Sequence, residues 1–160
     1  MGGAIAPANP AYGPSELAHQ LRDSGAIALI TSCALLPTAL KAIEEIPAMT
    51  QNLVFVIDGR DHKTQKTIDQ LIRDGRKIDS LKPLKLAPGE GKTKLAFISY
   101  SSGTTGLPKG VMVSHYNVIS NILQVVLHHK ESDDRKRDIT MTLLPLYHIY
   151  GGCNSFVTQH

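Results

Sequence analysis

Residues 95–113 read LAFISYSSGTTGLPKGVMV, and the rest of the chain is best understood from this stretch. It joins two apolar runs, residues 95–100 and 111–113, through a loop of ten residues rich in Ser, Thr and Gly. Short apolar runs bounded by such residues are typical of β-strands. Because so few residues separate the runs, they are compatible with an antiparallel hairpin. We therefore expect the loop, residues 101–110, to project from the end of a hairpin.

The loop itself carries the groups that bind phosphate. It holds four hydroxyl side chains, three glycines and Lys109. Glycines let the backbone approach a ligand closely and expose amide N–H groups. Hydroxyls donate to phosphate oxygens or complete the shell of a bound Mg²⁺, and a lysine adds a point charge. The composition predicts a phosphate cradle, although a flexible surface loop has a similar composition and stays open as an alternative.

Two common phosphate-binding motifs are not present in this loop. The Walker motif requires Gly-Lys followed by Ser or Thr, and the dinucleotide fingerprint requires G-x-G-x-x-G. Neither pattern occurs between residues 101 and 110. The predicted cradle is therefore of another type.

Upstream of the loop, strand and helix signals alternate along the chain. Apolar residues at helical spacing alternate with short continuous apolar runs, which are typical of buried strands in a parallel sheet. This order predicts an α/β fold with a mostly parallel sheet flanked by helices. Ser114 is expected to cap a helix that follows the hairpin. The expected helices are residues 15–24, 36–46 and 67–73, and the expected strands are residues 26–31, 53–57 and 139–144.

Composition and charge exclude several classes of protein. The chain has 160 residues, and its 17 Lys and Arg against 14 Asp and Glu give a net charge of +3. These cations are scattered, whereas nucleic-acid binders concentrate them, so no nucleic acid is expected as a partner. No apolar run is long enough for a membrane span, and the first residues lack the pattern of a signal peptide. Cys33 and Cys153 are too far apart in sequence for a zinc motif and are read as reduced thiols. We expect an intracellular protein, with cytoplasm and peroxisome both open; the sequence leaves the oligomeric state undetermined.

The full string from Tyr100 to Val111 closely resembles the phosphate-loop signature of the adenylate-forming superfamily. That superfamily includes acyl-CoA synthetases, non-ribosomal peptide adenylation domains and beetle luciferases. A second segment, LPLYHIYG at residues 144–151, resembles the family's Pro-x-Phe-His-x-x-Gly motif. A weaker third similarity lies in residues 9–24. The sequence His-Ile-Tyr-Gly is most similar to that of 4-coumarate–CoA ligase-like enzymes.

The resemblance implies an ATP-dependent carboxylate–CoA ligase, an acid–thiol ligase acting on a small carboxylic acid. In such enzymes the carboxylate attacks the α-phosphorus of ATP, which gives an acyl-adenylate and pyrophosphate. The thiol of coenzyme A then displaces AMP and forms a thioester. ATP, Mg²⁺ and coenzyme A are therefore the implied cofactors and co-substrates, and the sequence does not name the acid.

The resemblance also implies roles for individual residues. His148 would orient the carboxylate and adenylate, although a structural histidine at a strand end is the alternative. Tyr150 and Asn154 would line the acyl pocket, and ordinary core packing is the alternative for Tyr150. Thr104 or Thr105 would lie near Mg²⁺. The residues implied to hold the β- and γ-phosphates of ATP are Ser101, Ser102, Gly103, Thr104, Thr105, Gly106 and Lys109.

Several family elements have no counterpart in residues 1–160. These are the aromatic-Gly-x-Thr-Glu segment, the ribose-binding aspartate and the lysine of the C-terminal domain. Residues 1–160 are therefore expected to form a partial N-terminal AMP-binding domain without the catalytic-lysine domain. On this expectation the chain is a fragment that is inactive alone. A truncated non-catalytic nucleotide-binding module and a non-functional fragment are the alternatives.

Overall fold

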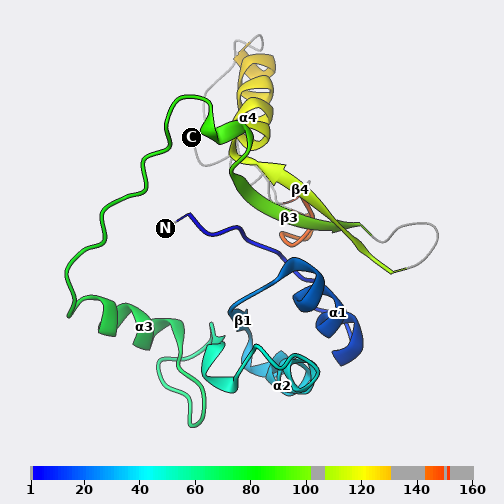
Figure 1. The fold of residues 1–160 in the computed structure, drawn as a ribbon, viewed down its shortest axis with the longest axis vertical. Helices are drawn as coiled ribbons and strands as arrows, with labels where there is room; N and C mark the ends of the chain where they lie inside the picture. The colour runs from blue at the N-terminus through cyan, green and yellow to red at the C-terminus, as the bar shows by residue number, and fades with distance from the viewer. Residues whose placement is uncertain (1, 102–106, 131–142, 150, 152–160) are drawn as a thin grey trace. The chain divides into compact units, whose positions relative to one another are not determined.

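The computed structural model describes residues 2–101, 107–130, 143–149 and 151 (Figure 1). The chain forms two compact units. Unit 1 consists of Pro10–Pro83, and unit 2 combines Gly2–Asn9 with the chain from Leu84 onward. Each unit is described by itself below.

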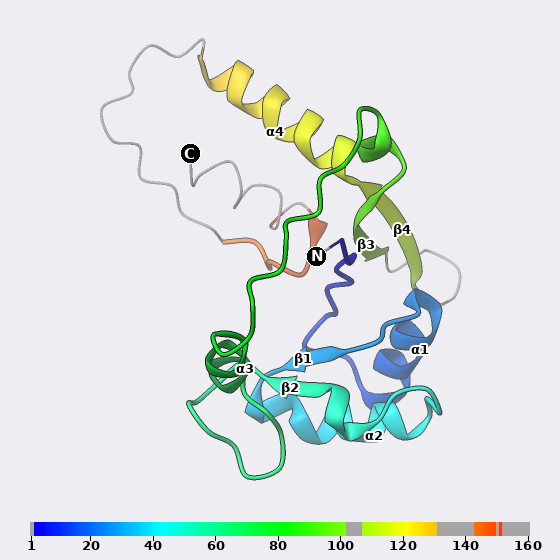
Figure 2. The ribbon, with the colours of Figure 1, turned by 60° about the vertical axis from the view of Figure 1, so that its left-hand side comes forward.

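Unit 1 contains three α-helices and one pair of strands. The strands β1 and β2 run parallel, with Leu29 opposite Val54 and Thr31 opposite Val56. Figure 2 shows the two strands side by side, with α2 next to them. Short 3-10 turns at Cys33–Leu35 and Gln51–Leu53 precede α2 and β2. In chain order the main elements are α1 Pro14–Ser24, β1 Leu29–Thr31, α2 Leu36–Glu44, β2 Val54–Val56 and α3 Ile68–Gly75.

The core of unit 1 forms where α1, α2 and β2 meet. Val54 and Val56 have no exposed surface, as expected for the strand predicted at residues 53–57. The helix predicted at residues 15–24 is confirmed as α1, and Gly25 ends it in the left-handed region at φ 63°. Gly13 caps its start, and the Glu16 carboxylate accepts a hydrogen bond from the Gly13 N–H at 2.8 Å. The α1 and α2 side chains buried in this core are Leu17, Ala18, Leu21, Leu36, Ala39, Ala42 and Ile43.

Residues 26–31 were predicted to form a buried strand, and the prediction of burial is wrong. Only Leu29–Thr31 form a strand, Ile27 is 83% exposed and Ile30 is 57% exposed. Ile30 lies on the opposite face of the strand from its two neighbours, because side chains alternate along a strand. That face is exposed in unit 1, so the apolar run does not mark a strand that is covered on both sides.

Helix α3 is held mainly by polar contacts. None of its residues is buried, but Thr67, which caps its start, has no exposed surface. The Thr67 hydroxyl accepts a hydrogen bond from the Gln70 N–H at 3.1 Å and donates one to the Arg60 carbonyl at 3.0 Å. The Gln70 side chain in turn accepts from the Thr67 N–H at 2.9 Å. This capping box fixes the helix that the sequence predicted at residues 67–73.

Unit 2 is built on an antiparallel hairpin of β3 and β4. The strands are β3 Leu95–Ser101 and β4 Lys109–Ser114, and α4 His115–Lys130 follows directly. A short 3-10 turn, Glu90–Lys92, precedes β3. On its other edge β3 is paired with Ile5, whose N–H donates to the Ala96 carbonyl at 3.0 Å and whose carbonyl accepts from the Ile98 N–H at 2.9 Å. The hairpin predicted from the sequence is confirmed.

The predicted Ser114 cap is also present. Its hydroxyl accepts a hydrogen bond from the Asn117 N–H at 3.2 Å and donates one to the Asn117 side chain at 2.7 Å. Because the cap residue is also the last residue of β4, the strand passes into α4 without a connecting loop. The helix therefore starts at a fixed point of the hairpin.

The α/β class predicted from the sequence is confirmed. Parallel pairing joins β1 to β2 and recurs at the isolated bridges Ile5–Phe97 and Val56–Thr67, whereas β3 and β4 are antiparallel. Of the strand predicted at residues 139–144, residues 139–142 lie outside the described residues, and Leu143 and Leu144 are not in a strand. Among the helices that the structure describes, none is long and apolar enough to cross a membrane.

We predict that Thr67→Val lowers the free energy of unfolding of the chain by about 1–3 kcal/mol, because valine keeps the shape but loses two buried hydrogen bonds. The measurement is the urea midpoint of the unfolding transition. Thr64→Val serves as the control, since Thr64 is exposed in the same connection. Equal midpoints for the two variants would contradict the importance of the cap.

Candidate functional site

The base of the predicted phosphate loop is defined by the last pair of the hairpin. Ser101 ends β3, Lys109 begins β4, and the two are direct cross-strand partners. Directly opposite residues place their side chains on the same face of a sheet, with Cβ atoms about 4.5–5.5 Å apart. Both residues are exposed. The structure therefore places the side chains of a serine and a lysine on one face of the hairpin at the mouth of the loop.

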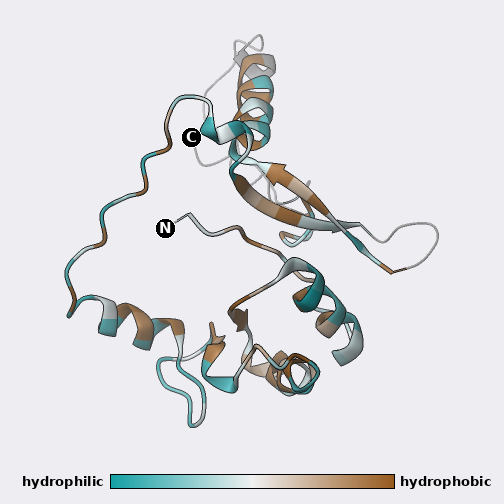
Figure 3. Cartoon of the chain, viewed as in Figure 1, coloured by the Kyte–Doolittle hydropathy of each residue, from teal (hydrophilic) through white to brown (hydrophobic). Residues whose placement is uncertain are grey.

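The centre of the loop lies outside the part of the chain that the structure describes. Ser102, Gly103, Thr104, Thr105 and Gly106 lie outside the described residues. Figure 3 shows that the paired strands carry hydrophobic residues along most of their length and hydrophilic residues near the loop. The change from apolar to polar side chains along the strands thus marks the start of the candidate site.

Ser99 is a polar residue on the same face that the sequence analysis did not single out. It pairs with Val111, two residues before Ser101, so its side chain shares the face of Ser101 and Lys109. Ser99 is 9% exposed, and its hydroxyl has no hydrogen-bond partner within the described part of the chain. Buried hydroxyls are normally hydrogen-bonded. The sequence signal for Ser99 is a serine two positions before Ser101, within the mainly apolar run of residues 95–100.

The second predicted site segment forms a tight turn. The His148 N–H donates to the Pro145 carbonyl at 3.1 Å, and the His148 side chain is exposed. Gly151 is buried, and a Cβ at this position would collide with the Pro145 carbonyl oxygen. The glycine of this motif is therefore required for the close approach of two backbone segments. Tyr150 and Asn154 lie outside the described residues.

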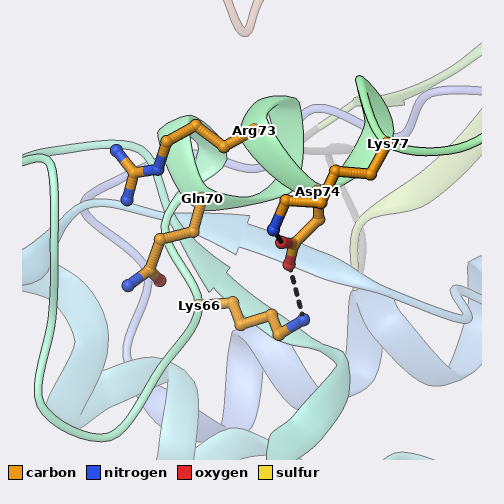
Figure 4. A pocket seen from close by; sticks show the side chains of 5 residues that line it. All are labelled: Lys66, Gln70, Arg73, Asp74 and Lys77. Carbon is orange, nitrogen blue, oxygen red and sulfur yellow. Dashed lines mark hydrogen bonds and ion pairs between the residues drawn. The ribbon is translucent and has the colours of Figure 1, made fainter.

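A separate cavity of about 340 Å³ lies along α3 in unit 1 (Figure 4). Asp74 bridges two lysines, with Lys66 at 3.0 Å and Lys77 at 3.1 Å. The hydrogen bond from Lys66, followed by that from Lys77, holds the pKa of Asp74 below its usual value. The cavity is lined by Lys66, Gln70, Arg73, Asp74 and Lys77.

The charges around this cavity are already paired with one another. Arg73 contacts the Asp61 carboxylate at 2.8 Å, and Gln70 donates to the same oxygen at 2.9 Å. An anionic ligand would have to displace these carboxylates. We therefore interpret the cluster as structural, because Asp61 links the loop before α3 to the helix. Within residues 2–101, 107–130, 143–149 and 151, no group of His, Cys, Asp or Glu is arranged to hold a metal ion.

Comparison with known proteins places these observations in a family. A family model described as "AMP-binding enzyme" matches residues 1–158. The chain belongs to this family of AMP-binding enzymes. The resemblance of residues 100–111 and 144–151 to adenylate-forming enzymes is thereby confirmed at the level of the family.

Relatives of this AMP-binding chain include an acyl-CoA ligase of Alternaria alternata. It is 34% identical over 157 residues, which cover 94% of this chain and 26% of the relative. A long-chain-fatty-acid–CoA ligase of Salmonella typhimurium is 30% identical, with 89% of this chain and 28% of the relative covered. The ATP-bound structure of MatB from Rhodopseudomonas palustris matches with a TM-score of 0.67 and 28% identity, over 98% of this chain and 28% of MatB.

The chain thus spans about a quarter of the length of the curated relatives it matches. The match to MatB covers nearly all of this chain, so both units have counterparts in that structure. The likeness therefore extends beyond the loop motif to the elements of each unit.

We predict that the Asp74 ion pairs stabilise the chain in a pH-dependent way. A carboxyl group whose pKa is lowered by folding contributes stability above its unfolded pKa, near the ordinary value of 3.8, and loses it as the pH falls through the lower folded pKa. The difference in urea midpoint between the wild type and Asp74→Asn should therefore be constant at neutral pH and shrink below about pH 4. The effect should be small, because the pairs are exposed to solvent.

Asp69→Asn is the matched control, since Asp69 is an exposed acid in the first turn of the same helix. A midpoint difference for Asp74→Asn that stays constant from about pH 7 down to pH 2 would show that the pairs do not contribute.

Proposed function

We propose that this chain supplies the phosphate-binding part of an ATP-dependent carboxylate–CoA ligase. The observation that supports this most is the pairing of Ser101 with Lys109 at the base of the loop in a member of the AMP-binding enzyme family. The two named relatives are CoA ligases, and MatB has been solved with ATP bound. The substrate of the whole protein would be a carboxylic acid.

In the first step of the proposed reaction the carboxylate attacks the α-phosphorus of ATP, and pyrophosphate leaves with the bonding electrons. Catalysis of such transfers depends on positioning and on neutralising charge. Lys109 would hold the departing phosphates with its ammonium group, and the hydroxyls would donate hydrogen bonds. The orphaned Ser99 hydroxyl, on the same face, is a further polar group at this end of the hairpin. The proposed phosphate-binding set is Ser101, Ser102, Gly103, Thr104, Thr105, Gly106 and Lys109.

The hydroxyl of Thr104 or Thr105 is proposed to lie near Mg²⁺. Mg²⁺ prefers oxygen ligands and is commonly shared between a protein side chain, water and substrate phosphates. A threonine hydroxyl in a loop that also binds phosphates fits that chemistry. When bound, the ion would offset negative charge on the leaving pyrophosphate.

In the second step the thiol of coenzyme A attacks the acyl carbon of the adenylate, and AMP leaves. This gives a thioester and completes an acid–thiol ligase reaction. His148 is proposed to orient the carboxylate and the adenylate, while Tyr150 and Asn154 would line the acyl pocket. The turn held by Pro145 and Gly151 would place His148 at the start of that pocket.

Residues 1–160 are proposed to be part of the N-terminal AMP-binding domain. On this proposal the adenylation lysine of the family lies outside these residues. An intracellular location, cytoplasmic or peroxisomal, stays a prediction. The second candidate is a nucleotide-binding module without catalysis.

We predict that Lys109→Ala weakens binding of MgATP to the chain by about tenfold or more, because a hydrogen bond to a charged group is worth about 1.5–3 kcal/mol. Titration calorimetry with MgATP measures this. Lys85→Ala is the control, since Lys85 is an exposed lysine in the segment before β3. Equal affinities for Lys109→Ala and the wild type would remove Lys109 from the phosphate site.

Pyrophosphate exchange separates the two candidate functions. Incorporation of labelled pyrophosphate into ATP that depends on added carboxylic acid would establish adenylation by the chain. Binding of MgATP without exchange would favour the non-catalytic module. Absence of binding would argue against both.

A further inference from the structure

Gly110 is a glycine inside a strand, and its backbone conformation does not require a glycine. It belongs to β4 and pairs with Tyr100 of β3. Among the described glycines, positive φ angles occur at Gly2, Gly25, Gly59 and Gly89, and Gly110 is not one of them. A glycine in the interior of a strand weakens it and commonly marks a place where another group comes close.

The space beside Gly110 is filled by two side chains of β3. A Cβ at Gly110 would lie 2.8 Å from Ile98 Cγ2, 3.1 Å from Tyr100 Cζ and 3.2 Å from the Tyr100 hydroxyl oxygen. Side-chain carbons do not approach to 2.8 Å without a shift of one partner. Tyr100 is the direct partner and Ile98 the diagonal one, so both close over the same point of β4.

Of these two neighbours, Ile98 is the one that cannot give way. Its Cγ2 is bonded directly to Cβ, and β-branched side chains are stiff at χ1. The Tyr100 atoms lie at the far end of a longer side chain, which turns aside more easily. An added methyl group at Gly110 would therefore push β4 away from β3 at this point.

Lys109 is the next residue toward the loop, and its pairing with Ser101 defines the loop base. We propose that Gly110 is a positioning residue, which lets Ile98 and Tyr100 close over β4 and thereby holds Lys109 opposite Ser101. Gly110 acts here through the strand and need not touch the ligand. The effect on ligand binding rests on the proposed function of the loop.

The test uses Gly110→Ala in the 160-residue chain with MgATP and AMP as the probes. At a catalytic centre a misplacement of about 1 Å can cost about a hundredfold in rate, and we expect a smaller loss of affinity for a displaced binding group. We expect MgATP affinity to fall by about tenfold and AMP affinity to change much less, because AMP lacks the β- and γ-phosphates. A general loss of folding would weaken both ligands alike. Equal losses for the two ligands, or no loss, would overturn the proposal.

Gly91→Ala is the matched control. Its Cβ would lie 3.9 Å from His115 Cβ, an ordinary contact in the same unit. We expect neither ligand affinity to change in this variant. The double variant Ile98→Ala/Gly110→Ala removes the stiff neighbour, so its MgATP affinity should return to within about threefold of that of Ile98→Ala alone. Absence of this rescue would overturn the proposal.

Amide hydrogen exchange keeps the test independent of ATP. Exchange of the β3 and β4 amides should accelerate at the loop end in Gly110→Ala and return toward the Ile98→Ala rates in the double variant. If the wild-type chain fails to bind MgATP, the proposed function fails, whereas the exchange data still decide the role of Gly110 in the hairpin. Unchanged exchange in Gly110→Ala would overturn that role.

If Gly110→Ala does not fold, recovery of folding in the double variant supports the clash between Ile98 and a Cβ at position 110, and failure to recover refutes it.

Discussion

The register of the β3–β4 hairpin is the constraint on which the candidate site depends. A slip of one residue moves every side chain of a strand to the other face of the sheet. Such a slip would take Lys109 away from Ser101 and bring Gly110 out from under Tyr100. Three features fix the register: the irregularity between Leu95 and Phe97, the direct passage into α4 at Ser114, and the space that Gly110 leaves.

The two units are stabilised by different means. In unit 1 the helices α1 and α2 bury apolar faces, but α3 is attached through the Thr67 cap and the Asp61 carboxylate. Unit 2 depends on strand pairing and on the helix cap at Ser114. Polar contacts therefore attach α3, whereas apolar burial attaches α1 and α2. In α3 the buried hydrogen bonds contribute more to stability than the exposed ion pairs.

Features that depend on neighbouring residues in sequence were predictable. The helix start at Thr67, the cap at Ser114 and the left-handed end at Gly25 follow from residue types at fixed spacing. Burial of Ile27 and Ile30 was predicted wrongly, because a continuous apolar run does not say how many layers cover a strand.

Contacts between distant residues gave no signal in the sequence. The Arg73–Asp61 pair and the approach of Ile98 to Gly110 depend on how strands and helices meet. For the candidate site, the motif predicted that Ser101 and Lys109 belong to one loop, and only the register shows that they face each other. The roles of Thr104 and Tyr150 stay predictions, since both residues lie outside the described part of the chain.

Ile5 gives unit 2 an unusual architecture, because it is separated in sequence from the strand it completes. It forms hydrogen bonds with the edge of β3, although the whole of unit 1 lies between them in the sequence. A polypeptide that started at Leu84 would keep the hairpin and α4 but lose this cover. Unpaired strand edges invite association with other chains. Unit 2 is therefore a discontinuous module, and removal of Ile5 would leave this edge of its sheet open to association with other chains.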